Sequence, residues 1–427
     1  MSDARFTGAE VRALKFADPL ADPRLLSGLT RDYLIWDAFV AGVRRVDLHP
    51  VVLDDALHRS AVATAERVAS TIGAIAARAH VDAAERARYG LHEDVLHLAR
   101  TSFEAKDDAA LVRVDLLLAE DGTWQACEIN ADCPGGHNEA LGLPRLAREA
   151  GFSGGTDPTR VVDALCRRIK ELATDEAGNV GAVALVYATA YAEDLQVCAL
   201  IQRALERSGV VALLASPTAP RLDRGAVTVR GVPIRVLYRF FPAEYMEGQR
   251  NLSDLCQAIA AGKLRTISSF SNIFAQSKLA FARAWALADA GIMLHAELDS
   301  IPATWELGDV ARELLVNARH DWVIKRAFGR VGDEVFVGTL IPDAEWPALV
   351  DAILERAAEA EHERWIAQRF VRQRPILTPW GPRFLTLGAY VLDGQFVGYF
   401  SRVTPEPHVS HGALCLPVLL DAPKRRA

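Results

Sequence analysis

The order of apolar and polar residues predicts helices in the first hundred residues and a β-hairpin directly after them. Before residue 100, the apolar residues with the clearest three- and four-residue spacing are Val62, Ala65, Ala69, Ile72 and Ala76. This spacing is typical of a helix with one apolar face. From residue 111 the pattern changes to two strand-like runs, 111–118 and 124–130, joined by a turn with the signal Asp121-Gly122.

The middle of the chain has the pattern of an open α/β unit. The apolar run 180–187 predicts a strand, residues 193–207 predict a helix that ends before Gly209, and 210–214 predicts a second strand. A further strand is predicted at 234–238. A strand, a helix and a strand in close succession favour a parallel sheet. No GxGxxG motif follows the first strand, so a dinucleotide-binding fold has little support.

The last part of the chain, from about residue 251, has the pattern of an α+β unit. Its predicted helices cover 278–290 and 346–357, and its predicted strands cover 322–325, 334–337, 365–371, 385–391 and 396–403. The dipeptide Asp393-Gly394 predicts a hairpin between the last two strands. We therefore expect an α/β and α+β protein in three parts, residues 1–150, 151–250 and 251–427.

The composition is that of a globular protein with a large core. Of the 427 residues, 50% are hydrophobic and 24% are charged, and the net charge is −7. These values exclude a disordered chain, and the lack of a long basic block argues against a nucleic-acid partner. The six cysteines form no CxxC pair, and the N-terminus lacks the apolar segment of a signal peptide. No apolar run reaches the roughly 20 residues of a membrane span, so we expect a cytoplasmic protein without a membrane partner.

The predicted hairpin carries the first candidate site. Arg113 and Asp115 lie two apart on one strand, and Glu128 and Asn130 lie two apart on the other, so each pair shares a face. The turn brings the pairs together. Two carboxylates and a carboxamide offer the hard oxygen donors that Mg²⁺ prefers. The alternative is a solvated outer face with an Arg–carboxylate pair.

A second candidate site follows the predicted strand 322–325. Lys325 ends this strand, and the loop after it contains Gly329, Arg330 and Gly332. A lysine followed by a glycine loop with an arginine is a plausible phosphate-binding arrangement, because glycines let backbone N–H groups approach phosphate oxygens. The alternative is a basic surface hairpin.

Two weaker candidates accompany it. Lys278 begins a predicted helix after Ser277, where the structural alternative is a solvated lysine. The run from Gln368 through Phe370 to Val371 can offer backbone groups to an adenine edge, or it is an ordinary edge strand.

Taken in order, these motifs are similar to the nucleotide site of ATP-grasp ligases, in the circularly permuted glutathionylspermidine synthase-like branch. The acidic cluster precedes both lysines, which is the permuted order. The resemblance extends from about residue 100 to 403 and is carried by Arg113-Val114-Asp115, Glu128 to Pro134, 237–246, Ser271 to Lys278, Trp322 to Gly332, Gln368 and Arg402. It implies a circularly permuted ATP-grasp fold with an inserted open α/β domain similar to the pre-ATP-grasp domain.

The resemblance also implies a role for each residue. A pair of Mg²⁺ ions that bridge the phosphates of ATP would be held by Asp115, Glu128 and Asn130. Phosphates would be contacted by Lys278 and Lys325 and covered by a mobile lid that includes Gly329, Arg330 and Gly332. The adenine pocket would be lined by Gln368, Phe370 and Val371, and the acyl-phosphate and tetrahedral states would be stabilised by Arg113 and Arg402.

The expected function is that of an ATP-dependent carboxylate–amine ligase with small-molecule substrates. An amino acid, a short peptide or a polyamine would each fit. After Asp132 the chain has Cys-Pro-Gly-Gly-His where the synthetases carry a Thr- and Ser-containing loop, so the resemblance does not extend to glutathione as substrate. The alternatives are a catalytically silent relative that binds a nucleotide or peptide, a kinase that stops at a phosphorylated product, and a Rossmann-type oxidoreductase.

Overall fold

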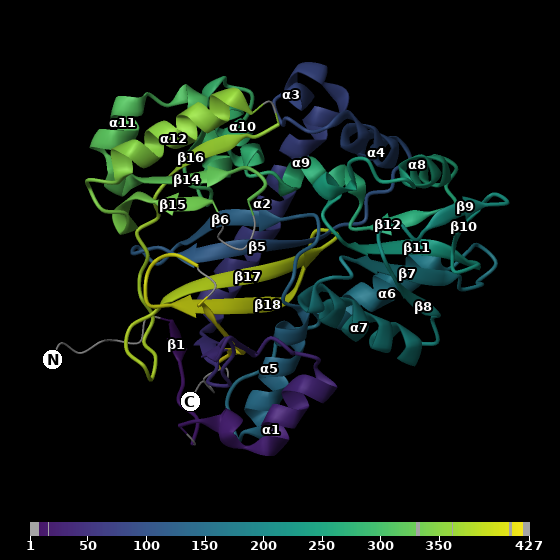
Figure 1. The fold of residues 1–427 in the computed structure, drawn as a ribbon. Helices are drawn as coiled ribbons and strands as arrows, with labels where there is room; N and C mark the ends of the chain where they lie inside the picture. Colours follow the sequence, from purple (N-terminus) through teal and green to yellow (C-terminus); the bar gives the residue numbers. More distant parts are fainter. Residues whose placement is uncertain (1–7, 16, 330–333, 361, 410–411, 422–427) are drawn as a thin grey trace.

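The computed structural model describes residues 8–15, 17–329, 334–360, 362–409 and 412–421 (Figure 1). Its centre is an antiparallel sheet of order β19-β18-β17-β5-β6. These strands are β5 (Leu111–Leu118), β6 (Trp124–Asn130), β17 (Phe384–Leu392), β18 (Gln395–Thr404) and β19 (Leu414–Leu416). The two predicted hairpins therefore exist, and β5 pairs with β17 to join them into one sheet. The pairing unites the first and last parts of the chain, while the division at residues 150 and 250 stays a prediction.

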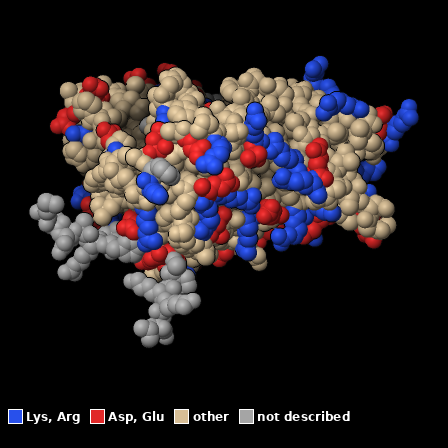
Figure 2. All heavy atoms as spheres, turned by 90° about the horizontal axis from the view of Figure 1, so that it is seen from below, with Lys and Arg blue, Asp and Glu red and all other residues tan. Residues whose placement is uncertain are grey.

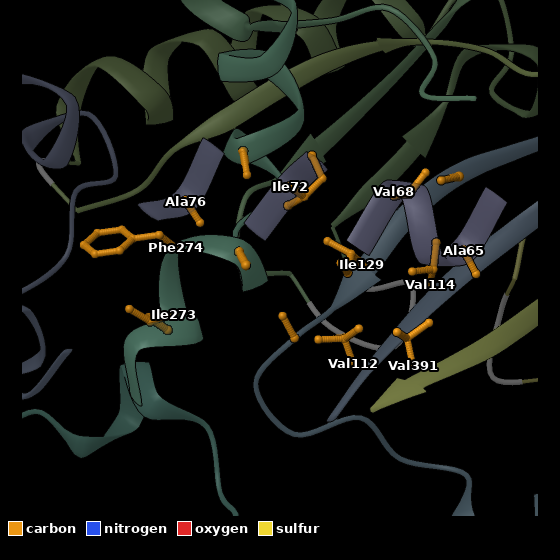
Figure 3. Close-up of a cluster of buried hydrophobic side chains, with 14 of the residues drawn as sticks. Ala65, Val68, Ile72, Ala76, Val112, Val114, Ile129, Ile273, Phe274 and Val391 are labelled. Carbon is orange, nitrogen blue, oxygen red and sulfur yellow. The ribbon is translucent and has the colours of Figure 1, made fainter. Parts of the chain in front are cut away.

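One face of the central sheet is covered by the long helix α2 (Asp55–Val81). The predicted apolar stripe of α2 packs on alternate residues of the sheet, as Figure 3 shows for Val68 and Ile72 of the helix and Val112 and Val114 of β5. Each fully buried side chain of this kind contributes roughly 1.5–3 kcal/mol of burial free energy. Because side chains alternate along a strand, Arg113 and Asp115, which alternate with these valines, face away from α2.

A second antiparallel sheet has the order β13-β16-β14-β15. Its strands are β13 (Thr304–Glu306), β14 (Trp322–Arg326), β15 (Val335–Val337) and β16 (Trp365–Arg369), with helices α10 (Leu279–Asp289), α11 (Arg312–Asn317) and α12 (Trp346–Glu359). Trp322 and Ile324 pack with Trp346 of α12 in a separate core. Lys325 alternates with them and faces the other side. The α+β prediction for this part is confirmed.

The α/β unit is also confirmed. Strands β7 (Ala182–Tyr187), β8 (Ala212–Ala215), β11 (Val232–Phe240) and β12 (Arg265–Ile267) pair in parallel. Helix α7 (Ala192–Arg207) ends two residues before Gly209, which has a φ of +81°. This left-handed glycine lets the chain form a C-terminal cap, in which Val210 N donates to Leu205 O at 3.0 Å. The unit also contains helices α6 (Val161–Ala173) and α8 (Leu252–Ala260). Strands β9 (Arg221–Asp223) and β10 (Ala226–Val229) form an antiparallel edge, and the sequence pattern did not predict this edge.

The first hundred residues are helical only in part, which corrects the prediction. Besides α1 (Pro23–Ser27), α2, α3 (Ala83–Ala87) and α4 (Glu93–Glu104), they contain four short strands: β1 (Ala9–Val11), β2 (Phe39–Val40), β3 (Val43–Arg44) and β4 (Val51–Leu53). Strand β4 pairs with β1 and with β20 (Val418–Leu420) near the other end of the chain. Strands this short carry no readable alternation. Strands β1 and β4 are stabilised by pairing between distant segments, whereas β2 and β3 pair with each other in a local hairpin.

The described helices and one face of the surface bear on whether a membrane or a nucleic acid is a partner. No helix in the described part of the chain is long and apolar enough to cross a membrane. On the face shown in Figure 2, the described basic and acidic side chains are intermixed over the surface. This face therefore presents no continuous basic patch of the kind that tracks a nucleic-acid backbone.

Candidate active site

Arg113, Asp115, Glu128 and Asn130 lie together on the hairpin of β5 and β6. Asp115 lies opposite Glu128 and Arg113 lies opposite Asn130 in the strand register. A bulge between these pairs and the rest of the hairpin leaves Cys127 unpaired. The side chains project from the face that α2 does not cover.

Asp115 is the centre of the cluster. Arg113 Nε donates to Asp115 Oδ1 at 2.6 Å and Arg113 Nη2 donates to Oδ2 at 2.9 Å. Arg402, which reaches over from β18, donates through Nη2 to Oδ2 at 3.0 Å. Burial alone would raise the pKa of Asp115, which is only 1% exposed, but Arg113 and Arg402 outweigh it and hold that pKa below its usual range. Asp115 therefore stays ionised.

Lys278, the residue directly before α10, contacts the cluster. Its Nζ lies 3.1 Å from Glu128 Oε1 and donates to Gly329 O at 2.6 Å. Its backbone N donates to Ala327 O at 2.9 Å, so this lysine is tied to the chain that follows β14. Lys278 is buried, whereas the Glu128 side chain is 24% exposed. Ser277 Oγ accepts a hydrogen bond from the first helical N–H, that of Leu279, at 3.3 Å.

Lys325 bridges the two antiparallel sheets. Its Nζ donates to Cys127 O, on the bulge of β6, at 3.0 Å and to Gln368 Oε1 at 2.7 Å. Gln368 Nε2 in turn donates to Thr304 Oγ1 at 3.0 Å. Burial is the main cause that lowers the pKa of Lys325. The Gln368 side chain thus holds a lysine that the sequence predicts to contact phosphate.

The remaining predicted positions follow strands β14 and β16 in the sequence. Strand β16 is an inner strand between β13 and β14, so the alternative of an ordinary edge strand is wrong. Phe370 and Val371 follow its end, and Phe370 N donates to Asp321 O at 2.8 Å. Gly329 is buried, and the predicted lid residues Arg330 and Gly332 lie outside the described residues.

The donor chemistry of the cluster fits Mg²⁺. Among the described residues, no group of three or more His, Cys, Asp or Glu side chains is arranged to hold a metal. The candidate set of Asp115, Glu128 and Asn130 has two carboxylates and a carboxamide, all hard oxygen donors. Asn130 Nδ2 lies 3.5 Å from Asp115 Oδ2, which also accepts from Arg402. A metal ion on Asp115 would therefore compete with Arg402 for that oxygen.

The profile of the glutathionylspermidine synthase preATP-grasp family matches residues 53–420. The chain belongs to this family. Family membership favours a ligase.

Solved structures support the fold. A glutathione synthetase-like effector from Globodera pallida, solved in its apo form, has 13% sequence identity and a TM-score of 0.55, over 93% of this chain and 98% of that one. A putative gamma-glutamylcysteine synthetase from Methylobacillus flagellatus KT has 12% identity and a TM-score of 0.41, over 74% of this chain and 81% of that one. The first likeness supports a shared fold and the second is too distant for an argument. None of the curated protein sequences matches the chain.

The loop after β6 fixes the end of this strand to the α/β unit. Gln276 Oε1 accepts from the backbone N of Ala131 at 2.9 Å and of Asp132 at 3.0 Å. Asp132 forms a fully buried ion pair with Arg239 of β11, and its Oδ2 accepts from Ala243 N at 2.8 Å. These contacts place the end of β6 without relying on a ligand.

The same loop leads into α5 (His137–Glu149). Gly136, with a φ of +91°, is the N-cap residue. Burial first, and Arg113 second, lower the pKa of His137 to about 3, so its imidazole is neutral. A zinc site with Cys133 is absent among the described residues.

Gly388 is a site residue that the sequence analysis missed. It lies on β17, directly opposite Asp115. A Cβ atom at this position would lie 2.7 Å from Arg113 Cδ and 3.1 Å from Asp115 Oδ1. The Arg113–Asp115 pair therefore occupies the space that a side chain would take. An isolated glycine inside an apolar strand is the available signal, because it marks a close approach.

With the role that the family resemblance implies for Arg113, we expect Gly388→Ala to lower kcat/KM for ADP release by about a hundredfold, because a displacement of even about 1 Å would misplace its positive charge. Steady-state ADP release checks this result. Gly73→Ala in α2 is the control, since a Cβ there meets nothing within 4 Å. Equal activity of the two variants would show that activity does not require the space beside Gly388 that the Arg113–Asp115 pair occupies.

Proposed function

We propose that the protein is an ATP-dependent carboxylate–amine ligase that forms an amide through an acyl phosphate. The observation that carries this proposal is the convergence of four cationic side chains on the hairpin that bears Asp115 and Glu128. Arg113 and Arg402 contact Asp115, Lys278 contacts Glu128, and Lys325 reaches the same hairpin. Such a cluster of positive charge favours the anionic triphosphate of ATP.

The fold fits this proposal as a permuted ATP-grasp arrangement. The hairpin with Asp115 and Glu128 precedes the lysine-bearing elements in the chain, and β17 and β18 complete its sheet. The α/β unit, with β11 at the centre of its sheet, lies in sequence between this hairpin and the lysine-bearing elements and would be the inserted pre-ATP-grasp-like domain.

The reaction would proceed in two balanced steps. The substrate carboxylate attacks the γ-phosphorus of ATP, an acyl–oxygen–phosphorus bond forms, and ADP leaves. The amine then attacks the acyl carbon, the amide bond forms, and inorganic phosphate leaves with the proton balance completed by solvent. An ionised carboxylate is a poor electrophile, so the phosphoryl group supplies the leaving group.

The side chains of the cluster would divide these tasks. Mg²⁺ held by Asp115, Glu128 and Asn130 supplies positive charge for the phosphate oxygens. Lys278 and Lys325 bind phosphate oxygens, for which Lys278 exchanges its contacts with Glu128 and the Gly329 carbonyl. Arg113 and Arg402 offset the charge that develops on the acyl phosphate and on the tetrahedral state. Gln368, Phe370 and Val371 would line the adenine pocket, and the loop from Gly329 through Arg330 to Gly332 would cover the phosphates.

The substrates would be a small carboxylic acid and a small amine, such as an amino acid, a short peptide or a polyamine. The Cys-Pro-Gly-Gly-His loop that begins at Cys133 lies beside the Arg113 side chain, since Arg113 Nη1 donates to Gly135 O at 2.8 Å. This loop would shape the acid site. The enzyme would act in the cytoplasm.

We expect Lys325→Ala to weaken the affinity for ATP by about tenfold to a hundredfold. A hydrogen bond to a charged group is worth roughly 1.5–3 kcal/mol, and each 1.4 kcal/mol is tenfold in affinity. Calorimetric titration with a non-hydrolysable ATP analogue and Mg²⁺ measures the change. Lys263→Ala, which removes an exposed lysine, is the control. Unchanged affinity in Lys325→Ala would remove this lysine from the nucleotide site.

The direct test is Mg²⁺-dependent ADP release that requires both an acid and an amine. The alternative of a catalytically silent relative has one observation in its favour, since Arg113 and Arg402 already occupy both oxygens of Asp115. Such a protein would bind ATP and release no ADP with any substrate pair.

A further inference from the structure

Phe400 lies beside both arginines of the candidate site. Its ring centroid is 5.2 Å from Cζ of Arg113 and 5.6 Å from Cζ of Arg402. Both distances are within the range of about 6 Å in which a guanidinium is attracted to the face of an aromatic ring. Phe400 and Arg402 are two residues apart on β18, and Arg113 lies on β5. One ring therefore contacts side chains from two strands.

Two glycines leave the space that this arrangement needs. Gly388 lies opposite Phe400 in the pairing of β17 with β18, so no side chain separates the ring from Asp115 on the next strand. On the other side, a Cβ atom at Gly136 would lie 2.7 Å from Phe400 Cδ2. The ring is thus enclosed between the sheet and the start of α5, and it is buried.

The position of the Arg402 side chain depends on this ring more than the position of Arg113 does, because Arg402 has fewer other described contacts. Arg113 has three further hydrogen bonds, two to Asp115 and one to Gly135 O. Within the part of the chain that the structure describes, Arg402 donates one hydrogen bond, to Asp115, and its buried Nε has no hydrogen-bond partner. Two guanidiniums on one carboxylate also repel each other, and the negative face of the ring offsets part of this repulsion.

We propose that Phe400 is a positioning residue that holds Arg113 and Arg402 in place for the reacting phosphoryl and acyl groups. This inference rests on the proposed ligase function. The contacts described for the ring are with Arg113 and Arg402, to which the proposed function assigns the chemical steps, so we expect its loss to lower the rate of those steps and to leave ATP binding in place.

The experiment compares Phe400→Leu and Phe400→Met with Phe396→Leu. Phe396 lies on the same strand, is 9% exposed against 8% for Phe400, and packs in the core on the α2 side with Tyr399. We expect both Phe400 variants to lower kcat by about tenfold to a hundredfold, with KM for ATP within about twofold. Phe396→Leu loses comparable packing and keeps kcat, so it separates a positioning effect from a stability effect.

A second readout does not depend on turnover. The side-chain Nε–Hε NMR signals of Arg113 and Arg402, assigned through Arg113→Lys and Arg402→Lys, are shifted by the ring current of Phe400. We expect Phe400→Leu to move both signals and Phe396→Leu to leave them in place. Unmoved signals, or a kcat equal to that of Phe396→Leu, would overturn the positioning role while wild-type turnover still supports the ligase. A wild-type protein without turnover would instead contradict the ligase proposal. The NMR signals would then test only the contact between the Phe400 ring and the two arginines.

Discussion

Glu128→Gln is expected to lower turnover by about a thousandfold while the protein stays folded. Glutamine keeps the shape of the side chain and removes its charge. The metal would lose an anionic ligand, and Lys278 would lose its partner at 3.1 Å. Electrostatic stabilisation by a metal is worth several kcal/mol, and a loss of about 4 kcal/mol corresponds to about a thousandfold in rate. Because the Glu128 side chain is 24% exposed and outside the apolar core, the change adds no cavity.

The measurement is steady-state ADP formation over a range of Mg²⁺ concentrations, with thermal unfolding as a check of the fold. Glu120→Gln is the matched control, since Glu120 is an exposed carboxylate in the turn of the same hairpin. We expect the Glu128 variant to need more Mg²⁺ for its residual rate. Full activity at ordinary Mg²⁺ concentration would contradict the metal assignment.

Arg239→Ala is expected to destabilise the fold by about 3–5 kcal/mol, the range seen when one partner of a buried ion pair is removed. Arg239 and Asp132 have fully buried side chains. Arg239 also donates to Ser268 O at 3.2 Å and stacks at 4.5 Å on the ring of Phe270. Without the guanidinium, the Asp132 carboxylate stays buried and loses its ion-pair partner, while the backbone N of Ala243 remains as a donor. The pair joins the end of β6 to β11, so the loss also loosens the site.

Urea unfolding measures this loss as a shift of the transition midpoint. Arg312→Ala is the control, because Arg312 pairs with Asp351 on the surface, where an ion pair contributes little. We expect no measurable shift in the control. The double variant Asp132→Ala with Arg239→Ala is expected to lose less than the sum of the single losses, since the residues interact directly. Equal midpoints for Arg239→Ala and Arg312→Ala would show that the buried pair does not hold the two parts together.

Local signals were sufficient for the elements that hold most of the site. The Asp121-Gly122 turn between two β-rich runs predicts the first hairpin, and the two-residue spacing of Arg113 and Asp115 predicts their shared face. The structure has both features. Helix α2 and the parallel strands around α7 were predictable for the same reason, because their periodicity lies within one short window.

The rest depends on pairing between distant segments, which no local window contains. Strand β4 has three residues and pairs with β20 near the other end of the chain. Gly388 gains its importance only when β17 lies between Asp115 and Phe400, and this register follows from the assembled sheet. Gln276 likewise acts through the backbone of Ala131, a contact that sequence spacing cannot indicate.

The most direct test of the ligase proposal is ADP formation with Mg²⁺ and pooled carboxylic acids and amines, followed by mass spectrometry of the products. The account predicts ADP release that needs both pools, and one new compound whose mass is that of an acid plus an amine minus water. It also predicts one ADP for each molecule of that compound. A stable phosphorylated acid without any amide, or ATP binding without ADP release across the panel, would contradict it.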